Sequence, residues 1–507
     1  PTRNLGSQLM NRQAVEERVA AESSRETARE AAKESAKDVR SFMKVLEGTG
    51  DMVTVDKEVH WDLELGAISR RVTEMDGPAL WFRNITDYPG QSIFVNPIST
   101  WRRAAVTLGL AADARIPQIY EEYIRRDSNP IPPVEVKDSH CREVVIRGKD
   151  LDVCELATPM IHDGDGGRYL GTWCIVVCKD PDTGWVNWGT YRFMIHNSEY
   201  LVGWPFPPSH AGTILQEKFV PQNKPMPVAI VMGADPASHL AATSTTRIGR
   251  DEASLAGGLA GHPIEVVRCL DSDLIIPATS ECVLEGEILP DRIAHEGPYA
   301  EYPGYRSGEM GAGILMRVNT ICHRKNPVLT MDCTGLKDCT SVVAALGGGI
   351  GIQRTLERAG VPVTGVYVPS EGAIHLCIVG VSKGGPEVTQ KVLDTMTRRR
   401  TYMTKILVVE DDVDIFNLSE VIHAWATRCH SGRGVFIKHV EGSAQALTPC
   451  YDMDERARRA GAVAAFDVSF PLSWDRTEIP MKATFEGVYP AEIRKKVLDN
   501  WKAYGLK

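Results

Sequence analysis

Several signals that identify particular protein classes are missing from this sequence. No apolar run approaches the roughly 20 residues that a membrane-spanning helix needs, and the polar N-terminal residues include no apolar signal-peptide core. The 12 cysteines form no Cys-x-x-Cys pair. Because several of them stand singly inside apolar runs, we expect buried, reduced thiols. These absences predict a cytoplasmic protein that does not associate with a membrane.

An excess of positive charge is missing as well. The chain has 57 Lys and Arg residues against 66 Asp and Glu residues, which gives a net charge of −9. It also contains no long basic run. A surface that binds nucleic acid needs positive charge to attract the phosphates, so we expect no nucleic-acid partner.

The composition that is present is typical of a globular protein that mixes helices and strands. Apolar residues make up 43% of the 507 residues, and 44 Gly and 30 Pro supply many turns. At about 150 residues per domain, this length predicts roughly three domains. We expect the fold class α/β (α+β), with an extension at 1–45, an α/β domain at 46–135, a strand-rich domain at 141–325, an α/β domain at 326–470, and a C-terminal tail and helix at 471–507.

Changes in the sequence pattern set these boundaries. In the first segment each acid from Glu22 to Glu34 precedes a base by three residues, which predicts a polar, exposed helix. Pro130-Ile-Pro-Pro133 is typical of a linker. After it, short strand-like runs separated by turn residues predict an antiparallel barrel or sandwich. Beyond Lys325, strands alternate with helical periods, which indicates a second α/β domain.

The stretch His295-Glu-Gly-Pro-Tyr-Ala-Glu-Tyr-Pro-Gly-Tyr305 carries the clearest chemical signal. It contains two carboxylates, Glu296 and Glu301, and its two prolines exclude a regular helix. We expect a bent loop with aromatic walls. A carboxyl group beside tyrosines loses hydration of its charged form, so its pKa rises and it can act as a general acid. The alternative is a solvated surface loop.

A second set of residues could hold a metal ion. Asn187 opens the sequence Asn187-Trp-Gly-Thr-Tyr-Arg192, and His210 and Glu252 follow. Amide, imidazole and carboxylate ligands suit Mn²⁺ or Mg²⁺ better than a soft metal. Asn187 and Arg192 differ by an odd number of positions, so both can face one site only if the chain bends near Gly189. Arg192 is the natural cation for a buried carboxylate of the Glu pair.

Two further motifs suggest other functions. Lys405-Ile-Leu-Val-Val-Glu-Asp-Asp412 resembles the opening strand of a phosphoacceptor domain, which would make this a non-catalytic signalling or assembly protein. The required second aspartate is missing from the later strand-like run, so we expect these acids to cap a helix start before Ile415. Gly347-Gly-Gly-Ile-Gly351 could bind phosphate at a helix start, although it lacks the P-loop lysine. A simple glycine turn is the alternative.

Taken together, these residues resemble the UbiD-like family of prenylated-FMN-dependent (de)carboxylases. The resemblance rests on the order and spacing of six residues: Asn187, Arg192, His210, Glu252, Glu296 and Glu301. It extends to the stretches His60–Ile68 and Val408–Thr427, and so covers most of the chain.

The resemblance implies a role for each site residue. Three residues would bind a divalent metal, normally Mn²⁺, that bridges to the flavin phosphate: Asn187, His210 and Glu252. Backbone carbonyls around Ala241–Ser244 would hold K⁺. Three residues would form the catalytic ion-pair network: Arg192, Glu296 and Glu301. Four others would contact the cofactor: Thr190, Tyr191, Ser209 and, through the phosphate, Lys383.

The family also implies an architecture, partners and a reaction. The central domain would be a split β-barrel that binds prenylated FMN, and the C-terminal α/β domain and helix would assemble a homodimer or homohexamer. A flavin prenyltransferase would supply the cofactor. The reaction would be reversible non-oxidative decarboxylation of an aromatic, heteroaromatic or α,β-unsaturated carboxylic acid at an sp² carbon, with Arg192 orienting the substrate and Glu301 delivering the proton. A carboxylase of the same family acting on an aromatic substrate is the alternative.

Overall fold

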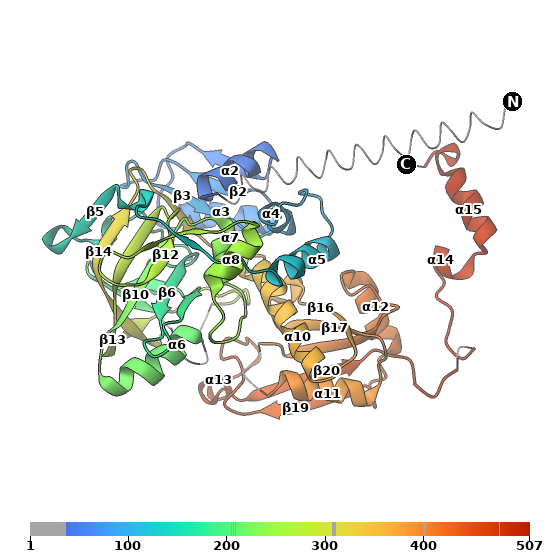
Figure 1. The fold of residues 1–507 in the computed structure, drawn as a ribbon. Helices are drawn as coiled ribbons and strands as arrows, with labels where there is room; N and C mark the ends of the chain where they lie inside the picture. Colours follow the sequence, from blue (N-terminus) through green and yellow to red (C-terminus); the bar gives the residue numbers. More distant parts are fainter. Residues whose placement is uncertain are drawn as a thin grey trace.

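Four β-sheets organise the residues that the computed structural model describes, which are 37–203, 205, 207, 209–306, 311–398, 402–475 and 477–506 (Figure 1). The predicted polar helix lies outside these residues up to position 36. Helices and strands are mixed along the whole described chain. The predicted α/β (α+β) fold class is therefore confirmed.

The N-terminal sheet is closed by a strand from much later in the chain. Its order is β1 (Met52–Val55), β2 (Ala79–Phe82), β3 (Ser92–Val95) and β15 (Val328–Met331). Four helices accompany it: α2 (Val39–Gly48), α3 (Glu64–Glu74), α4 (Trp101–Thr107) and α5 (Ile116–Asp127). Because β15 pairs in parallel with β3, the chain returns to this sheet directly after it leaves the central domain.

The central domain is an open, eight-stranded antiparallel sheet. Its path runs β7 (Val186–Gly189), β6 (Ile175–Lys179), β10 (Met226–Met232), β13 (Cys282–Glu296), β14 (Gly311–His323), β9 (Tyr200–Gly203) and β8 (Phe193–Ile195), and β5 (Val144–Arg147) pairs with β14. The path ends at β7 and β8 without closing, as expected for a split barrel. Beside it lie a small sheet of β12 (Ile275–Pro277), β11 (Glu265–Arg268) and β4 (Val134–Glu135), and the helices α6 (His210–Ile214), α7 (Pro236–Ala242) and α8 (Glu252–Ala260).

The C-terminal sheet has five strands. Their order is β16 (Val363–Tyr367), β17 (Leu376–Val381), β18 (Lys405–Glu410), β20 (Gly461–Asp467) and β19 (Val435–Val440). The helices of this part are α9 (Cys339–Val343), α10 (Gly349–Arg358), α11 (Pro386–Met396), α12 (Leu418–Arg428) and α13 (Met453–Arg458). β17, β18 and β20 are parallel, so their carboxyl ends share one edge of the sheet. This edge matters for the placement of Lys383.

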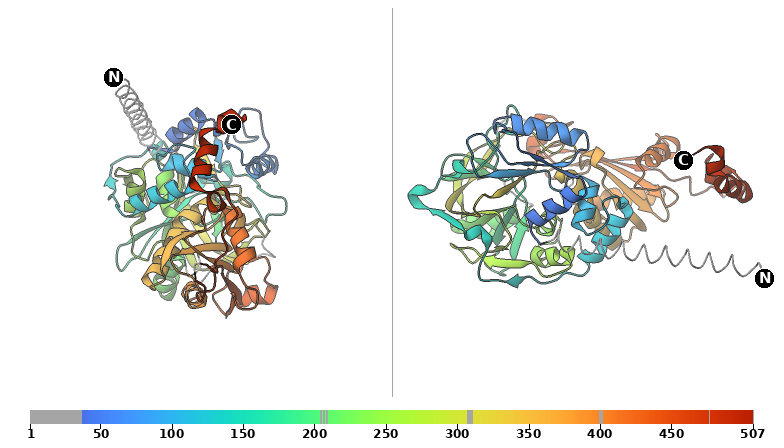
Figure 2. Two further views of the ribbon diagram at one scale, coloured as in Figure 1. Left: turned by 90° about the vertical axis from the view of Figure 1, so that its right-hand side faces the viewer. Right: turned by 90° about the horizontal axis from the view of Figure 1, so that it is seen from above.

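The C-terminal residues form an arm that leaves the body. It contains α14 (Phe485–Val488), α15 (Ala491–Asp499) and a short 3₁₀ helix at Trp501–Tyr504, none of which buries a residue. The right-hand view of Figure 2 shows this arm standing away from the sheets. The helix predicted in the tail is therefore present.

Helix α2 begins inside the stretch that the sequence pattern assigned to an exposed extension. Its apolar side chains are buried: Val39, Phe42, Met43 and Leu46. On the other side of the helix, the Arg40 guanidinium binds Glu281 of the central domain through two hydrogen bonds of 2.8 Å. From Val39 onward the chain is therefore part of the folded molecule.

The glycine run and the acidic motif have other roles than the sequence pattern suggested. Gly347 lies in one continuous helical stretch from α9 through a wider turn (Ala344–Gly348) into α10, so neither a phosphate-binding helix start nor a simple turn is present. A Cβ on Gly347 would lie 2.8 Å from the Ser244 Cα, so glycine permits this close packing. Asp412 caps no helix; it pairs with Arg428 at 2.7 Å, and α12 starts later, behind Asn417.

All twelve cysteines are free, and nine of them are buried. Cys154 and Cys429 are partly exposed and Cys450 is exposed, so the prediction of buried thiols is wrong for these three. Burial raises the pKa of the Cys377 thiol to about 12. The buried thiols are thus poor nucleophiles, because the thiolate is the reactive form.

Candidate active site

Strand β13 delivers Glu296 to the edge of the barrel, where the chain turns sharply. Glu296 is the last residue of the strand, and Gly297 adopts φ +88°, a left-handed conformation that favours glycine. The residues that follow, as far as Arg306, contain no helix. The bent loop that the two prolines predicted is therefore confirmed.

Arg192 and Tyr169 hold the Glu296 carboxylate from two directions. Arg192 donates from Nε to Oε1 at 2.8 Å and from Nη2 to Oε2 at 3.0 Å, which is a bidentate ion pair. The Tyr169 hydroxyl donates to Oε1 at 2.7 Å. Glu296 is 3% exposed, so these three donors replace the water that the carboxylate loses.

Glu301 meets the same guanidinium from the other side. Its Oε1 forms an ion pair with Nη1 of Arg192, and Glu301 itself is buried. The Tyr299 ring lies 5.2 Å from the centre of the Arg192 guanidinium, a cation–π distance. One arginine thus joins both acids of the loop in an environment with aromatic walls.

The bend between β7 and β8 makes this arrangement feasible. β7 ends at Gly189 and β8 begins at Phe193, so Arg192 does not continue the alternation of the strand that carries Asn187. A Cβ on Gly189 would lie 2.7 Å from the Tyr191 ring, which explains why glycine stands at the bend. The bend that the odd spacing required is confirmed.

A second cluster contains the predicted metal ligands. His210 is the first residue of α6 and Glu252 is the first residue of α8, and His210 Nδ1 lies 3.8 Å from Glu252 Oε1. Asn187 is buried in β7, beside Trp188, whose backbone N–H donates to Glu252 Oε2 at 3.3 Å. The structure therefore brings these residue types into one neighbourhood. Within the described chain no group of three or more His, Cys, Asp or Glu side chains is placed to hold a metal, so an amide would have to complete the set.

No Lys or Arg side chain of the described residues pairs with the Glu252 carboxylate. Burial raises its pKa to about 7, although Thr246 and the Trp188 N–H donate hydrogen bonds to it. Burial also lowers the pKa of His210, which favours the neutral imidazole that binds metals. Among the described residues, His210 is the one base within ion-pair distance of Glu252. A buried carboxylate with this environment favours binding of a cation.

Three other predicted cofactor contacts, Thr190, Tyr191 and Ser209, lie close in sequence to Arg192 or His210. Thr190 Oγ1 is buried and has no hydrogen-bond partner among the described residues. The Tyr191 hydroxyl accepts the Ala211 N–H at 3.2 Å, and Ser209 Oγ caps α6 by accepting the Gly212 N–H at 3.2 Å. Thr190 therefore offers a donor that a bound group could use.

Lys383 is not placed with the other predicted residues. It is exposed and follows the carboxyl end of β17, where the next residue, Gly384, donates its N–H to Glu410. The acid loop instead meets the C-terminal domain through Tyr302, whose hydroxyl accepts a 3.0 Å hydrogen bond from Gln445. Gln445 follows the end of β19, which lies at the amino end of β20. Because β17 and β20 run in the same direction, the carboxyl end of β17 and the amino end of β20 lie at opposite edges of the sheet. The assignment of Lys383 to the cofactor phosphate is therefore not supported within this chain.

Two aromatic residues were missed as parts of the site. Tyr169 binds Glu296, and its ring lies 4.2 Å from the ring of Tyr299, whose hydroxyl is 2.8 Å from Thr334 Oγ1. Burial raises the pKa of both phenols, so both stay protonated donors. Tyr299 stood in the motif itself, whereas nothing in the local sequence around Tyr169 points to Glu296.

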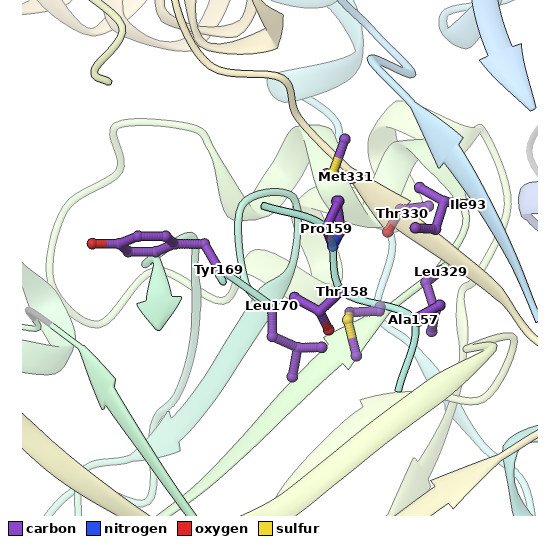
Figure 3. A pocket seen from close by; sticks show the side chains of 10 residues that line it. Ile93, Ala157, Thr158, Pro159, Tyr169, Leu170, Leu329, Thr330 and Met331 are labelled. Carbon is purple, nitrogen blue, oxygen red and sulfur yellow. The ribbon is translucent and has the colours of Figure 1, made fainter. Parts of the chain in front are cut away.

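A small cavity lies behind Tyr169, between the N-terminal sheet and the barrel (Figure 3). It is lined mainly by apolar residues, including Ile93, Leu170 and Leu329. The centre of a water molecule could occupy a volume of about 10 Å³ inside it. This is room for one water. In Figure 3 the Tyr169 hydroxyl points away from the other lining residues, which leaves it directed out of the cavity.

These features form a candidate acid–base site at the edge of an antiparallel barrel. A guanidinium joins two buried carboxylates, and the same region contains His210 and a carboxylate, Glu252, that has no Lys or Arg partner among the described residues. Such a site can bind an anionic substrate and exchange a proton with it. No helix of the described residues is long and apolar enough to cross a membrane.

The chain belongs to the 3-octaprenyl-4-hydroxybenzoate carboxy-lyase (UbiD) family. Models of three family domains match it in order: the N-terminal domain at residues 43–123, the Rift-related domain at 133–337 and the C-terminal domain at 341–464. The protein is thus a carboxy-lyase, and the signalling alternative has no support.

Full-length relatives agree with this assignment. The chain is 30% identical to the pyrrole-2-carboxylic acid decarboxylase of Pseudomonas aeruginosa over 92% of this chain and 98% of the relative. The closed form of the vanillic acid decarboxylase of Sedimentibacter hydroxybenzoicus has a TM-score of 0.82 at 27% identity, covering 92% and 98% of the two chains. An evolved dimeric form of HmfF from Pelotomaculum thermopropionicum, in complex with prFMN, has a TM-score of 0.73 at 25% identity, covering 88% and 97%.

Proposed function

We propose that this protein catalyses the reversible non-oxidative decarboxylation of an aromatic, heteroaromatic or α,β-unsaturated carboxylic acid with prenylated FMN. The observation that carries the proposal is the convergence of Glu296 and Glu301 on the single guanidinium of Arg192. Loss of CO₂ from an sp² carbon leaves an electron pair that no side chain can delocalise, and prenylated FMN would supply that electron sink.

The three residues would divide the work on the substrate. Arg192 would bind and orient the substrate carboxylate, because its planar guanidinium matches a carboxylate in two-point geometry. Glu296 would keep Arg192 in position through the bidentate pair. Glu301, which has a single contact to Arg192 Nη1, would deliver the proton that replaces CO₂. In the carboxylation direction the same residues would act in reverse, so a carboxylase remains the alternative.

The second cluster has the chemistry of a site for the cofactor phosphate and its metal. Asn187, His210 and Glu252 would bind Mn²⁺ or Mg²⁺, since the buried Glu252 carboxylate has no Lys or Arg partner among the described residues. The unsatisfied hydroxyl of Thr190 would donate to the same bound group. The carbonyls at the end of α7, around Ala241–Ser244, carry the negative end of the helix and would hold K⁺.

The relatives suggest small planar acids as substrates. One is named for pyrrole-2-carboxylic acid and another for vanillic acid, so a heteroaromatic or a phenolic acid is the first class to test. The sequence also suggests Trp204 and Phe206 as residues that line the substrate pocket, and both lie outside the described residues.

The function is tested with full-length protein co-expressed with a flavin prenyltransferase. We expect a bound flavin absorbance, one divalent metal per chain, and CO₂ release from at least one acid in a panel of heteroaromatic, phenolic and cinnamic acids. His210→Ala should purify with little flavin and metal, whereas His140→Ala, which changes an exposed histidine, should retain both. Colourless wild-type protein that releases no CO₂, or full flavin occupancy in metal-free His210→Ala, would contradict the proposal.

A further inference from the structure

The segment His162–Tyr169 binds the loop that carries the two acids, and most of it has no part in the chemistry proposed above. Its central residue is Asp165, whose side chain is fully buried. Asp165 Oδ1 accepts the Ala300 N–H at 2.9 Å, and Oδ2 accepts from His162 Nδ1 at 3.0 Å. Ala300 directly precedes Glu301, so Asp165 fixes the backbone from which the Glu301 side chain starts.

Two more contacts hold the loop on either side of this bond. Gly166 N–H donates to the Pro298 carbonyl at 2.7 Å, and a Cβ on Gly166 would lie 1.9 Å from the Gly297 oxygen, so the approach requires glycine. Farther along the loop, Arg306 Nη1 donates to the Asp163 carbonyl at 3.0 Å. The segment therefore holds the loop between the two acids, directly before Glu301 and beyond Glu301.

The same segment ends at Tyr169, which donates to Glu296. The Tyr299 ring fills the space between its two ends: it packs on Tyr169 at 4.2 Å and meets the His162 ring edge-on at 6.0 Å. One short stretch of chain thus contacts the environment of both acids, although the two acids lie on different sides of the Gly297 turn.

We propose that His162–Tyr169 is a template that positions both acids on Arg192, with Asp165 as the positioning residue for Glu301 and Tyr169 as the positioning residue for Glu296. This inference rests on the proposed function for its kinetic consequence, but its structural content does not depend on the substrate. A displacement of about 1 Å at a reacting group can cost about 10²-fold in rate, so contacts of this kind govern turnover more than substrate binding.

The first test is hydrogen exchange of the full chain without substrate. Asp165→Ala removes the acceptor of the Ala300 N–H, so peptides that cover 297–306 should exchange at least about tenfold faster. Asp165→Asn keeps an oxygen that can accept this N–H and should restore most of the protection. Asp51→Asn is the matched control, because it changes a buried aspartate that binds Arg103 outside the site. It should lower the midpoint of thermal unfolding and leave exchange of 297–306 unchanged.

The second test is steady-state kinetics of flavin-loaded protein. Asp165→Ala should lose roughly 10- to 100-fold in kcat, with KM within about threefold and flavin content unchanged, and Asp165→Asn should recover most of the loss. If Asp165→Ala does not fold, Tyr169→Phe removes only one hydroxyl and should lower kcat at constant KM.

Unchanged hydrogen exchange of 297–306 in Asp165→Ala would overturn the template. So would an unchanged kcat in both Asp165→Ala and Tyr169→Phe. The template would also be overturned if Asp165→Asn restored neither the exchange protection nor the kcat that Asp165→Ala loses. A wild-type protein that turns over none of the acids contradicts the proposed function instead, because the exchange result does not need turnover.

Discussion

Glu301 is the residue whose chemistry depends most on the proposed reaction. It contacts Arg192 through one oxygen, whereas Glu296 uses both of its oxygens. We expect Glu301→Gln to keep the fold and the flavin but to lose about 10²- to 10⁴-fold in turnover, because an amide has the same shape but no proton to transfer. Incorporation of deuterium from solvent into the product, measured by mass spectrometry, should fall in parallel.

Two other glutamates on β13 provide the comparison. Glu287→Gln removes a partly buried carboxylate that pairs with Arg317, and its turnover should match the wild type. Glu296→Gln should weaken the two-point contact with Arg192 and therefore affect substrate binding as well as turnover. Near-normal turnover in flavin-loaded Glu301→Gln would mean that another group carries the proton.

The buried thiols predict how stability depends on pH. Cys377 lies in β17, and burial raises its pKa from 9.0 to about 12. The unfolded chain releases this proton near pH 9 and the folded chain near pH 12. The stability that burial confers is therefore complete below pH 9 and falls as pH rises, by about 1.4 kcal/mol per pH unit for each such thiol. Cys377→Ala should reduce this alkaline loss by about that amount.

The measurement is denaturant unfolding between pH 8 and pH 10.5. Cys377→Ala should be less stable than the wild type at pH 8, because it leaves a small cavity, and the difference should shrink as pH rises. Cys450→Ala, which changes the exposed cysteine, should follow the wild type throughout. A pH dependence of Cys377→Ala that is parallel to that of the wild type would exclude ionisation of this thiol as a cause.

At the scale of helices and strands, short β-branched runs between turn residues were sufficient to predict most of the strands. The runs Met52–Val55, Ala79–Phe82 and Ser92–Val95, which are mainly apolar and rich in β-branched or aromatic residues, are strands β1, β2 and β3. The long pair β13 and β14 was predicted only in part, because their outer ends are exposed and polar and lack an apolar alternation. The pattern also missed the continuous helix around Gly347, since glycine lowers helix propensity and only the close contact with Ser244 explains it.

The burial of helix α2 leads to a prediction about stability. The polar residues that precede this helix had suggested an exposed segment. Phe42 is 1% exposed and packs edge-on against Phe94 of β3 at 6.4 Å. Phe42→Ala should cost about 3–5 kcal/mol, the range for a large buried aromatic side chain, and should lower the midpoint of thermal unfolding. Lys44→Ala changes an exposed position on the same helix and should stay within about 0.5 kcal/mol of the wild type. Equal stability of the two variants would mean that α2 does not pack on the body in solution.

At the scale of the whole molecule, the order and spacing of a few residue types predicted that certain side chains far apart in the sequence would come together, and the structure shows this for the two acids and the arginine at the edge of the barrel. Arg192, Glu296 and Glu301 meet although more than 100 positions separate Arg192 from Glu296. Tyr169 could not be found in this way, since its partner Glu296 is 127 positions away and a tyrosine in an apolar stretch is usually a core residue. Lys383 lies apart from the other predicted residues within this chain, because a local motif does not show at which edge of a parallel sheet it lies.

The C-terminal arm leads to the last prediction, which concerns assembly. Ile493, Leu498 and Trp501 are 43%, 59% and 40% exposed, and the helices that carry them bury no residue in the single chain. Exposed apolar side chains on an amphipathic helix call for a covering surface. The chain contains a short anchor for the arm, since Lys482 binds Asp412 and Glu420 of the C-terminal domain, and beyond it the arm extends away from the body (Figure 2).

We propose that a second copy of the chain covers the arm, in a homodimer or a homohexamer. Full-length protein should therefore have at least twice the chain mass of 55.8 kDa by light scattering, and Ile493→Asp combined with Leu498→Asp should shift it toward the monomer by placing charge in the interface. Lys495→Ala, which changes an exposed polar position of α15, should leave the mass unchanged. Since the site residues lie in the body of one chain, the dissociated variant should still bind flavin. A wild-type monomer, or an unchanged mass in the double variant, would mean that the arm has no part in assembly.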